Sequence, residues 1–238
     1  MILEIALGII TFLTSTVAAV VGIGGGMMLI AILPSFLPLN ALIPVHGITQ
    51  MTSNFSRAVF GYKDIQFEVI PKFLLGSVLG IALFSLILYF ISLQYVPLFI
   101  GSYILLSLWS NTFNEKIKRY ENYYIAGFFQ TGLSLVVGAT GPLTMTLLLK
   151  DYEDKDKVVA TGAALMSITH IFKVIVFIFF GFVFLDYIGV LFFMIIGAVA
   201  GSYVGTKLRN KIDGKKFVMI LKILLSLLAI KLIISLFI

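Results

Sequence analysis

Two apolar segments of the chain each carry a stripe of polar side chains, and each stripe ends in a cation. In both segments the polar residues recur at helical spacing, so they share one face of a helix. Pro44–Phe60 contains His46, Gln50, Ser53, Asn54 and Arg57, and Val158–Leu185 contains Ser167, Thr169, His170 and Lys173. Such stripes either bind a polar solute or form hydrogen bonds between membrane helices.

The cations of the two stripes predict an anionic ligand. Lys173 lies near the middle of its segment, where an ionisable group is costly and is a functional candidate. Arg57 lies nearer the end of its segment, and snorkelling to the membrane surface explains it equally well. The interval from Arg57 to Lys173 equals the interval between the VVG motifs that begin at Val20 and Val136, so the two cations occupy equivalent places in a repeat.

Neither stripe contains a carboxylate. Glu4 and Asp186 lie near segment ends and the other acidic residues lie in loops, which argues against a carboxylate proton relay or a carboxylate sodium site. His46 and His170 are the groups in the stripes that titrate near neutral pH. Simple hydrogen bonding explains them better than proton coupling does.

Glycine clusters interrupt two of the apolar stretches, within Val20–Phe36 and within Val136–Met145. Broken backbone at membrane depth is tolerated where it is buried in protein or lines a cavity. A short helix that begins at Gly25 or Gly141 would direct its first N–H groups, and about half a positive charge, at the break. The pattern predicts an anion site where the two breaks meet near the membrane midplane, and a structural kink is the alternative.

Other glycines are spaced for packing. Small residues four apart let membrane helices approach closely, and this explains Gly76 and Gly80 as well as Gly197, Gly201 and Gly205.

Composition excludes several classes of protein. The chain of 238 residues is 60% hydrophobic and only 12% charged, which is typical of a polytopic membrane protein. It contains no cysteine and two histidines, so we expect no metal site, no cofactor and no enzymatic activity. The net charge of +6 comes from short loops, a pattern of membrane topology and not of nucleic-acid binding.

The apolar segments predict an all-α protein with about eight to ten transmembrane segments, including short hairpin helices after the glycine breaks. They are Ile2–Val21, Gly24–Phe36, Pro44–Phe60, Phe73–Ile91, Val96–Ser110, Tyr123–Val137, Gly141–Leu149, Val158–Leu185, Ile188–Thr206 and Phe217–Ile238. With each hairpin counted as two crossings, the basic loops 61–72, 111–122, 150–157 and 207–216 share one side. The positive-inside rule places them in the cytoplasm and both termini outside the cell membrane.

The two halves of the chain predict an inverted repeat. We expect a first membrane repeat at residues 1–112, a cytoplasmic linker at 113–121 and a second repeat at 122–238. Each half has an odd number of crossings, so the second enters the membrane upside down. Inverted repeats are a signature of secondary transporters.

The motifs resemble the TauE/SafE sulfite exporter family of membrane permeases over nearly the whole chain. The resemblance rests on GIGGGMMLIAILPSF, HGITQMTSNFSRAVFGYKDI, the half-length echo GATGPLTMTLLL, and the paired GSVLG and GAVAG helices. It implies two related halves, with the glycine breaks and polar stripes forming a central site for sulfite, sulfoacetate or related sulfonates. The thiosulfate-uptake proteins of similar fold carry cysteines along their path, and this chain has none.

We therefore expect a secondary transporter, an exporter of small anions, that works by alternating access. An anion channel and a carboxylate permease of the same fold are the alternatives, whereas a membrane enzyme or an assembly subunit fits less well. The expected partners are the small anionic substrate and the lipid bilayer, and a homodimer is left open. The predicted substrate-binding residues are Gly24, Gly25, Gly26, Gln50, Asn54, Arg57, Gln130, Thr140, Gly141, Thr169, His170 and Lys173.

Overall fold

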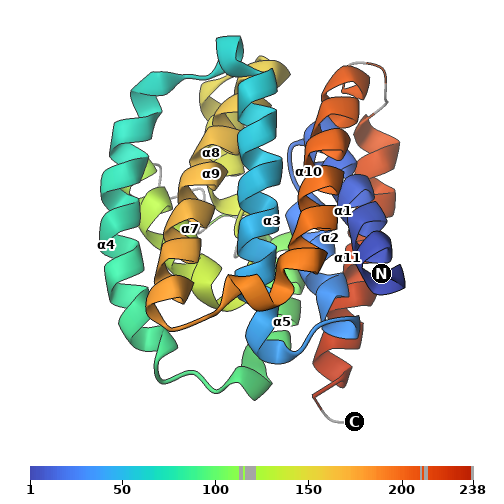
Figure 1. Cartoon of the computed structure of the whole chain (residues 1–238). Coiled ribbons are helices and arrows are strands. Elements are labelled where there is room, and N and C mark those ends of the chain that lie inside the picture. The colour runs from blue at the N-terminus through green and yellow to red at the C-terminus, as the bar shows by residue number, and fades with distance from the viewer. Residues whose placement is uncertain (113–114, 116–121, 210, 212–213, 237–238) are drawn as a thin grey trace.

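The computed structural model describes residues 1–112, 115, 122–209, 211 and 214–236. These residues form ten α-helices that follow the predicted apolar segments, with shifts at their ends (Figure 1). The helices are α1 Ile2–Val21, α2 Gly25–Ile32, α3 Leu39–Phe60, α4 Ile70–Leu88, α5 Val96–Trp109, α7 Tyr123–Val137, α8 Pro142–Asp151, α9 Lys155–Phe179, α10 Ile188–Leu208 and α11 Gly214–Ile234. Short 3-10 turns flank them at Leu33–Ser35, Tyr62–Asp64, Phe67–Val69, Leu93–Tyr95 and Phe184–Tyr187. The predicted linker 113–121 lies outside the described residues, apart from residue 115.

Glycines with positive φ end α1 and α7 and reverse the chain. Gly22 and Gly24 have φ of 93° and Gly138 has φ of 77°, a region that residues with a Cβ rarely adopt. A Cβ on Gly25 would collide with the carbonyl oxygen of Thr14, so α2 returns against the last turns of α1. α8 also folds back against α7, where Thr144 Oγ1 donates to Gln130 Oε1 at 2.6 Å. The predicted hairpins are confirmed.

Glycines also form the crossings of α1 with α10 and of α4 with α7. A Cβ on Gly201 of α10 would collide with the carbonyl oxygen of Phe12, and one on Gly80 of α4 with that of Phe128. The same close approach occurs at Gly76, Gly127, Gly197 and Gly205. The packing role predicted for Gly76, Gly80, Gly197, Gly201 and Gly205 is confirmed.

We expect Gly201→Ala to lower the melting temperature of the purified protein. The added methyl group meets backbone and cannot be accommodated by a rotamer change, and such overpacking costs about 1–3 kcal/mol. This corresponds to roughly 2–10 °C in a thermal unfolding scan. Gly162→Ala is the matched control, because its Cβ would meet only side-chain atoms, the nearest at 3.3 Å. An equal loss in both variants would contradict the close packing of α1 on α10.

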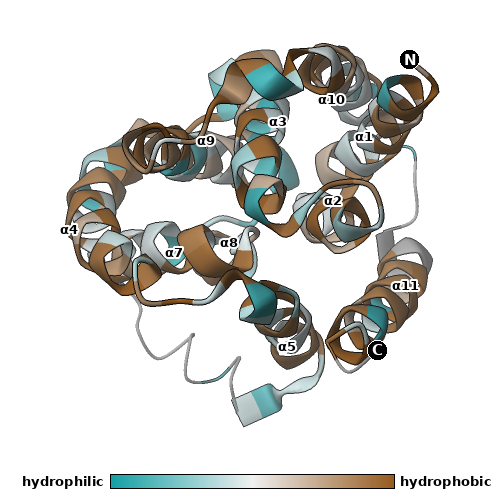
Figure 2. Cartoon of the chain, turned by 60° about the horizontal axis from the view of Figure 1, so that its bottom comes forward, coloured by the Kyte–Doolittle hydropathy of each residue, from teal (hydrophilic) through white to brown (hydrophobic). Residues whose placement is uncertain are grey.

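Large apolar side chains cover much of the outside of the bundle, and buried polar side chains lie in its interior beside an apolar core. Figure 2, which colours the ribbon by hydropathy, shows hydrophobic residues along outer helices such as α9 and α11. Leu79, Leu86 and Leu227 are 66%, 67% and 62% exposed, whereas Gln130 and Lys173 are fully buried. This is the arrangement of a protein solvated by lipid. Four stretches are long and apolar enough to cross a membrane by length and composition: Ile2–Val21, Phe67–Leu88, Lys155–Phe179 and Phe184–Leu208. The chain is an all-α polytopic membrane protein.

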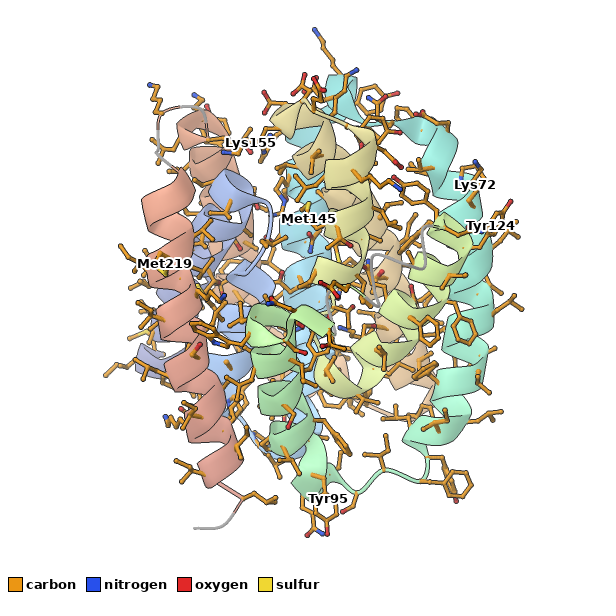
Figure 3. All side chains as sticks on the ribbon, turned by 180° about the vertical axis from the view of Figure 1, so that it is seen from behind. Lys72, Tyr95, Tyr124, Met145, Lys155 and Met219 are labelled. Atoms are coloured by element: carbon orange, nitrogen blue, oxygen red, sulfur yellow. The ribbon has the colours of Figure 1, made fainter. Side chains whose placement is uncertain are left out.

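The described parts of three predicted basic loops meet at one end of the bundle. Tyr152 donates to Glu68 Oε1 at 2.8 Å, which joins the loop after α8 to the start of α4. Lys155 Nζ donates to the carbonyl oxygen of Arg209 at 3.3 Å, which joins α9 to the end of α10. Figure 3 shows Lys155 at this end and Tyr95 at the other. Which membrane face this end meets stays a prediction.

Candidate functional site

The start of α2 presents backbone N–H groups that no side chain caps. Gly24, the residue before the helix, has no side chain that could accept a capping hydrogen bond from these N–H groups. The helical hydrogen-bond ladder begins only when Met28 N–H donates to the carbonyl oxygen of Gly24, at 2.8 Å. The amides of Gly25, Gly26 and Met27 precede that ladder, so they are the orphan donors that every helix start carries. Together with the helix dipole they favour a negative charge at this point.

α3 places three polar side chains against the start of α2. Arg57 Nη2 donates to Asn54 Oδ1 in a short hydrogen bond, and Asn54 Nδ2 donates to the carbonyl oxygen of Gln50 at 2.7 Å. Arg57 is only 4% exposed, and its Nε and Nη1 have no partner among the described residues. The same holds for Gln50 Nε2. A buried guanidinium without a counter-charge costs several kcal/mol, which a bound anion would offset.

Both helix breaks line one small cavity. About 40 Å³ is open to the centres of water-sized molecules, enough for about three waters at 10–15 Å³ each. No carboxylate stands among the lining residues, and Arg57 supplies their single charged side chain. They are Ala18, Gly22, Ile23, Gly24, Gly25, Gly26, Met27, Gln50, Asn54, Arg57, Ala139, Gly141, Pro142 and Met166. The wall is therefore rich in donors and cationic.

The start of α8 is capped from within the protein. Gln130 Oε1 of α7 accepts from the backbone N–H of Thr144 at 3.2 Å and from its hydroxyl at 2.6 Å. Pro142, the first residue of the helix, has no N–H to offer. The expectation that a helix beginning after Gly141 would aim open amides at the break is therefore not met. Gly141 lines the cavity, but behind it the Thr144 amide donates to Gln130 and the Leu143 amide donates to the carbonyl oxygen of Thr140 at 3.1 Å.

Gln130 is the hub of a buried polar network beside the cavity. Its Nε2 donates to Thr169 Oγ1 of α9 at 3.2 Å, and its backbone carbonyl oxygen accepts from Thr140 Oγ1 at 2.9 Å. Thr131 continues the network, since its hydroxyl donates to Ser77 Oγ of α4 at 2.8 Å. Fully satisfied buried networks make a structure rigid. These residues fix the second half of the site and do not present open donors to a ligand.

Basic side chains hold the carbonyl groups of both breaks. Lys173 Nζ of α9 donates to the carbonyl oxygen of Gly138 at 2.5 Å and lies 3.2 Å from His170 Nδ1. His46 Nε2 of α3 lies 3.0 Å from the carbonyl oxygen of Gly26. Lys173 and His170 are fully buried and do not line the cavity. They support its wall from behind.

Arg209 is a buried structural residue near the site that sequence reasoning missed. It follows the last residue of α10 and is only 2% exposed. Its Nε donates to the carbonyl oxygen of Ala19 at 2.8 Å, and its Nη1 pairs with Asp156 Oδ1 at 2.7 Å. The side chain therefore ties the end of α1, just before the first break, to the start of α9. In the sequence it is one of several cations in a basic loop, and nothing local marks it as buried.

The predicted site residues fall into two groups in the structure. Seven line the cavity, namely Gly24, Gly25, Gly26, Gln50, Asn54, Arg57 and Gly141. The remaining five, Gln130, Thr140, Thr169, His170 and Lys173, form the polar layer behind it. Met166, Ala139 and Thr144 were missed, because apolar lining and a helix cap depend on how the two hairpins meet. Among the described residues no group of three or more His, Asp or Glu side chains could hold a metal ion.

Fold and cavity together define a membrane transport protein, with broken helices that surround a small cationic chamber. The profile of the family described as Sulfite exporter TauE/SafE matches residues 7–232, and the chain belongs to this family. The family resemblance expected from the sequence is confirmed. Proteins of this family are transporters of sulfite and other anions rather than enzymes. No curated protein and no solved structure matches the chain.

Proposed function

We propose that the protein is a secondary transporter that exports small oxoanions such as sulfite through the cavity between α2 and α3. The observation that carries the proposal is the buried guanidinium of Arg57, a residue of the cavity wall whose Nε and Nη1 have no hydrogen-bond partner among the described residues. An oxoanion offers acceptor oxygens to this fork and to the amides of α2. Charge-assisted hydrogen bonds of this kind are about twice as strong as neutral ones.

The charge balance of the interior supports an anion as the ligand. Arg57, Lys173 and Arg209 are the buried charged residues in the described part of the chain, and all three are cations. Arg209 is paired with Asp156, whereas neither Arg57 nor Lys173 has a carboxylate partner there. A monoanion beside Arg57 would remove one uncompensated charge from the interior.

The size of the cavity favours the smallest candidate substrate. A cavity with room for about three water molecules suits a compact oxoanion better than sulfoacetate, which carries an additional carboxymethyl group. Sulfonates and carboxylates would require the cavity to widen. We therefore rank sulfite first, organosulfonates such as sulfoacetate second and simple carboxylates third.

The packing of the helices supports alternating access by two inverted repeats, residues 1–112 and 122–238. α1 of the first half packs on α10 of the second, α4 packs on α7, and α3 crosses α9. Helices at equivalent places thus exchange partners between the halves, as a twofold axis in the membrane plane requires. The cavity lies where the halves meet, so rocking of one half against the other would expose it to alternate sides.

Topology and partners follow from charge and composition. The basic end of the bundle would face the cytoplasm of a cell membrane, and both termini would lie outside. The lipid bilayer would surround the apolar surface, and nothing in the charge pattern calls for nucleic acid. No enzymatic step and no cofactor is part of the proposal. A homodimer stays a prediction.

Flux of labelled sulfite in proteoliposomes tests the proposal. A transporter should give saturable flux that unlabelled sulfite on the opposite side accelerates, because carriers return faster when loaded. An anion channel would instead give flux that rises linearly with concentration, together with a conductance in planar bilayers. Flux equal to that of protein-free liposomes, for sulfite and for the sulfonate and carboxylate panel alike, would overturn the proposed function.

A further inference from the structure

Two buried histidines face each other behind the cavity, and the proposed transport of anions assigns them no role. His46 of α3 and His170 of α9 are fully buried, with ring centroids 5.7 Å apart and planes at 73°. His46 Nδ1 and His170 Nε2 have no hydrogen-bond partner among the described residues. Two unsatisfied ring nitrogens inside a membrane protein call for an explanation.

The partners of the other ring nitrogens assign the tautomers. A carbonyl oxygen only accepts, so His46 Nε2 must carry the hydrogen that it shares with Gly26. His46 Nδ1 then holds a lone pair. An ammonium group at Lys173 donates to His170 Nδ1, so the hydrogen of His170 sits on Nε2. The open lone pair within this cluster of His46, His170 and Lys173 is therefore His46 Nδ1.

The charged groups that act on the pair are all cationic. Lys173 of α9 acts electrostatically on both histidines, and Arg57 of α3 acts on His170. α2 and α7 have no charged side chain among their residues, and α4, α8 and α10 carry theirs at or near their basic ends, at Lys72, Lys150, Asp151 and Lys207. With the cavity empty, a further positive charge on the pair is opposed. An anion beside Arg57 offsets one charge and removes part of that opposition.

We propose that His46 Nδ1 binds a proton together with the transported anion, so that the His46–His170 pair is the proton-coupling site of the transporter. This inference rests on the proposed anion site. His46 is linked to that site directly, because its Nε2 holds the carbonyl of Gly26, a residue of the cavity wall. A hydronium ion delivers the proton: one of its O–H bonds breaks, an N–H bond forms at Nδ1, and a water molecule is left. A monoanion then crosses with a proton and without net charge.

Thermodynamic linkage between anion binding and proton binding sets the size of the expected effect. If the anion promotes proton binding, the proton must promote anion binding by the same factor. Couplings between sites are typically about 5- to 150-fold, and we expect sulfite to tighten proton binding at His46 by roughly tenfold.

Nuclear magnetic resonance of ¹⁵N-histidine-labelled wild-type protein tests the proposal, because the chain contains only two histidines and one variant is enough to assign their signals. Spectra are recorded in detergent between pH 5 and 8, with saturating sulfite or with gluconate at equal ionic strength. His46→Gln assigns the signals, and its amide can still donate to the carbonyl of Gly26. We expect both histidines to be neutral Nε2–H tautomers in gluconate. In sulfite, His46 should become doubly protonated at a higher pH than it does in gluconate.

The outcomes separate the two proposals. Sulfite that binds, shown by a rise in melting temperature, while both histidines keep the same titration would overturn proton coupling and leave the anion site standing. Protonation of His170 in place of His46 would overturn the assignment to Nδ1 of His46. Absence of sulfite binding to the folded protein, together with absence of flux, would instead contradict the proposed function.

Discussion

Arg57→Gln is expected to lose sulfite binding without losing stability. The substitution removes the single charged side chain of the cavity wall and leaves a shorter, neutral amide. A hydrogen bond to a charged group contributes about 1.5–3 kcal/mol. Each bond that sulfite makes to the guanidinium thus accounts for roughly 10- to 150-fold in affinity. Titration calorimetry of the purified protein at fixed pH and ionic strength measures the change.

The stability of the Arg57 variant separates a binding role from a structural one. In the empty protein the guanidinium is buried without a counter-charge, so its removal should leave the melting temperature unchanged or raise it. Arg209→Gln is the matched control, since it leaves Asp156 without its buried partner and should lower the melting temperature while sulfite still binds. A melting temperature that falls in Arg57→Gln, with sulfite affinity intact, would show that Arg57 serves the fold alone.

Lys173→Met is expected to reduce sulfite transport strongly while reducing sulfite affinity much less. The thioether side chain keeps most of the volume of the lysine stem but cannot donate to the carbonyl oxygen of Gly138. That bond ties α9 to the second break, and loss of a charge-assisted bond of about 1.5–3 kcal/mol would let the break move independently of α9. We expect sulfite flux to fall at least about tenfold in proteoliposomes, at the lower end of that energy.

Two measurements on the Lys173 variant check this division of roles. Sulfite affinity from calorimetry should change less than in Arg57→Gln, because Lys173 does not line the cavity. The elution profile in detergent should match that of the wild type. Unchanged flux in the variant would contradict a role for Lys173 in transport. An affinity loss as large as that of Arg57→Gln would contradict its place behind the wall.

Hydrophobic patterning predicted the helices well, and departures occur at particular residues. α3 begins at Leu39, before the expected start at Pro44, because a proline near the first turns of a membrane helix loses one hydrogen bond that neighbouring groups can replace. α9 ends at Phe179, before Leu185, because Gly181 adopts a φ of 80° and turns the chain. Such local effects shift boundaries without changing the number of segments.

The site was harder to predict than the fold, because side-chain partners depend on how the hairpins close. Helical spacing correctly placed Gln50, Asn54 and Arg57 on one face, toward the cavity. The same spacing could not show that Gln130 would turn to cap Thr144, since the two residues meet only after α8 folds back on α7. Nor could it show which of the two buried cations, Arg57 or Lys173, would line the cavity.

The most direct test is to locate an anion in the structure. Selenite, a heavier analogue of sulfite, can be soaked into crystals of the protein and found by its anomalous scattering. We predict a single strong peak in the cavity, within hydrogen-bond distance of Arg57 and of the amides that start α2. A selenite peak confined to the surface, or one beside Lys173 with the Arg57 cavity empty, would contradict the proposed site.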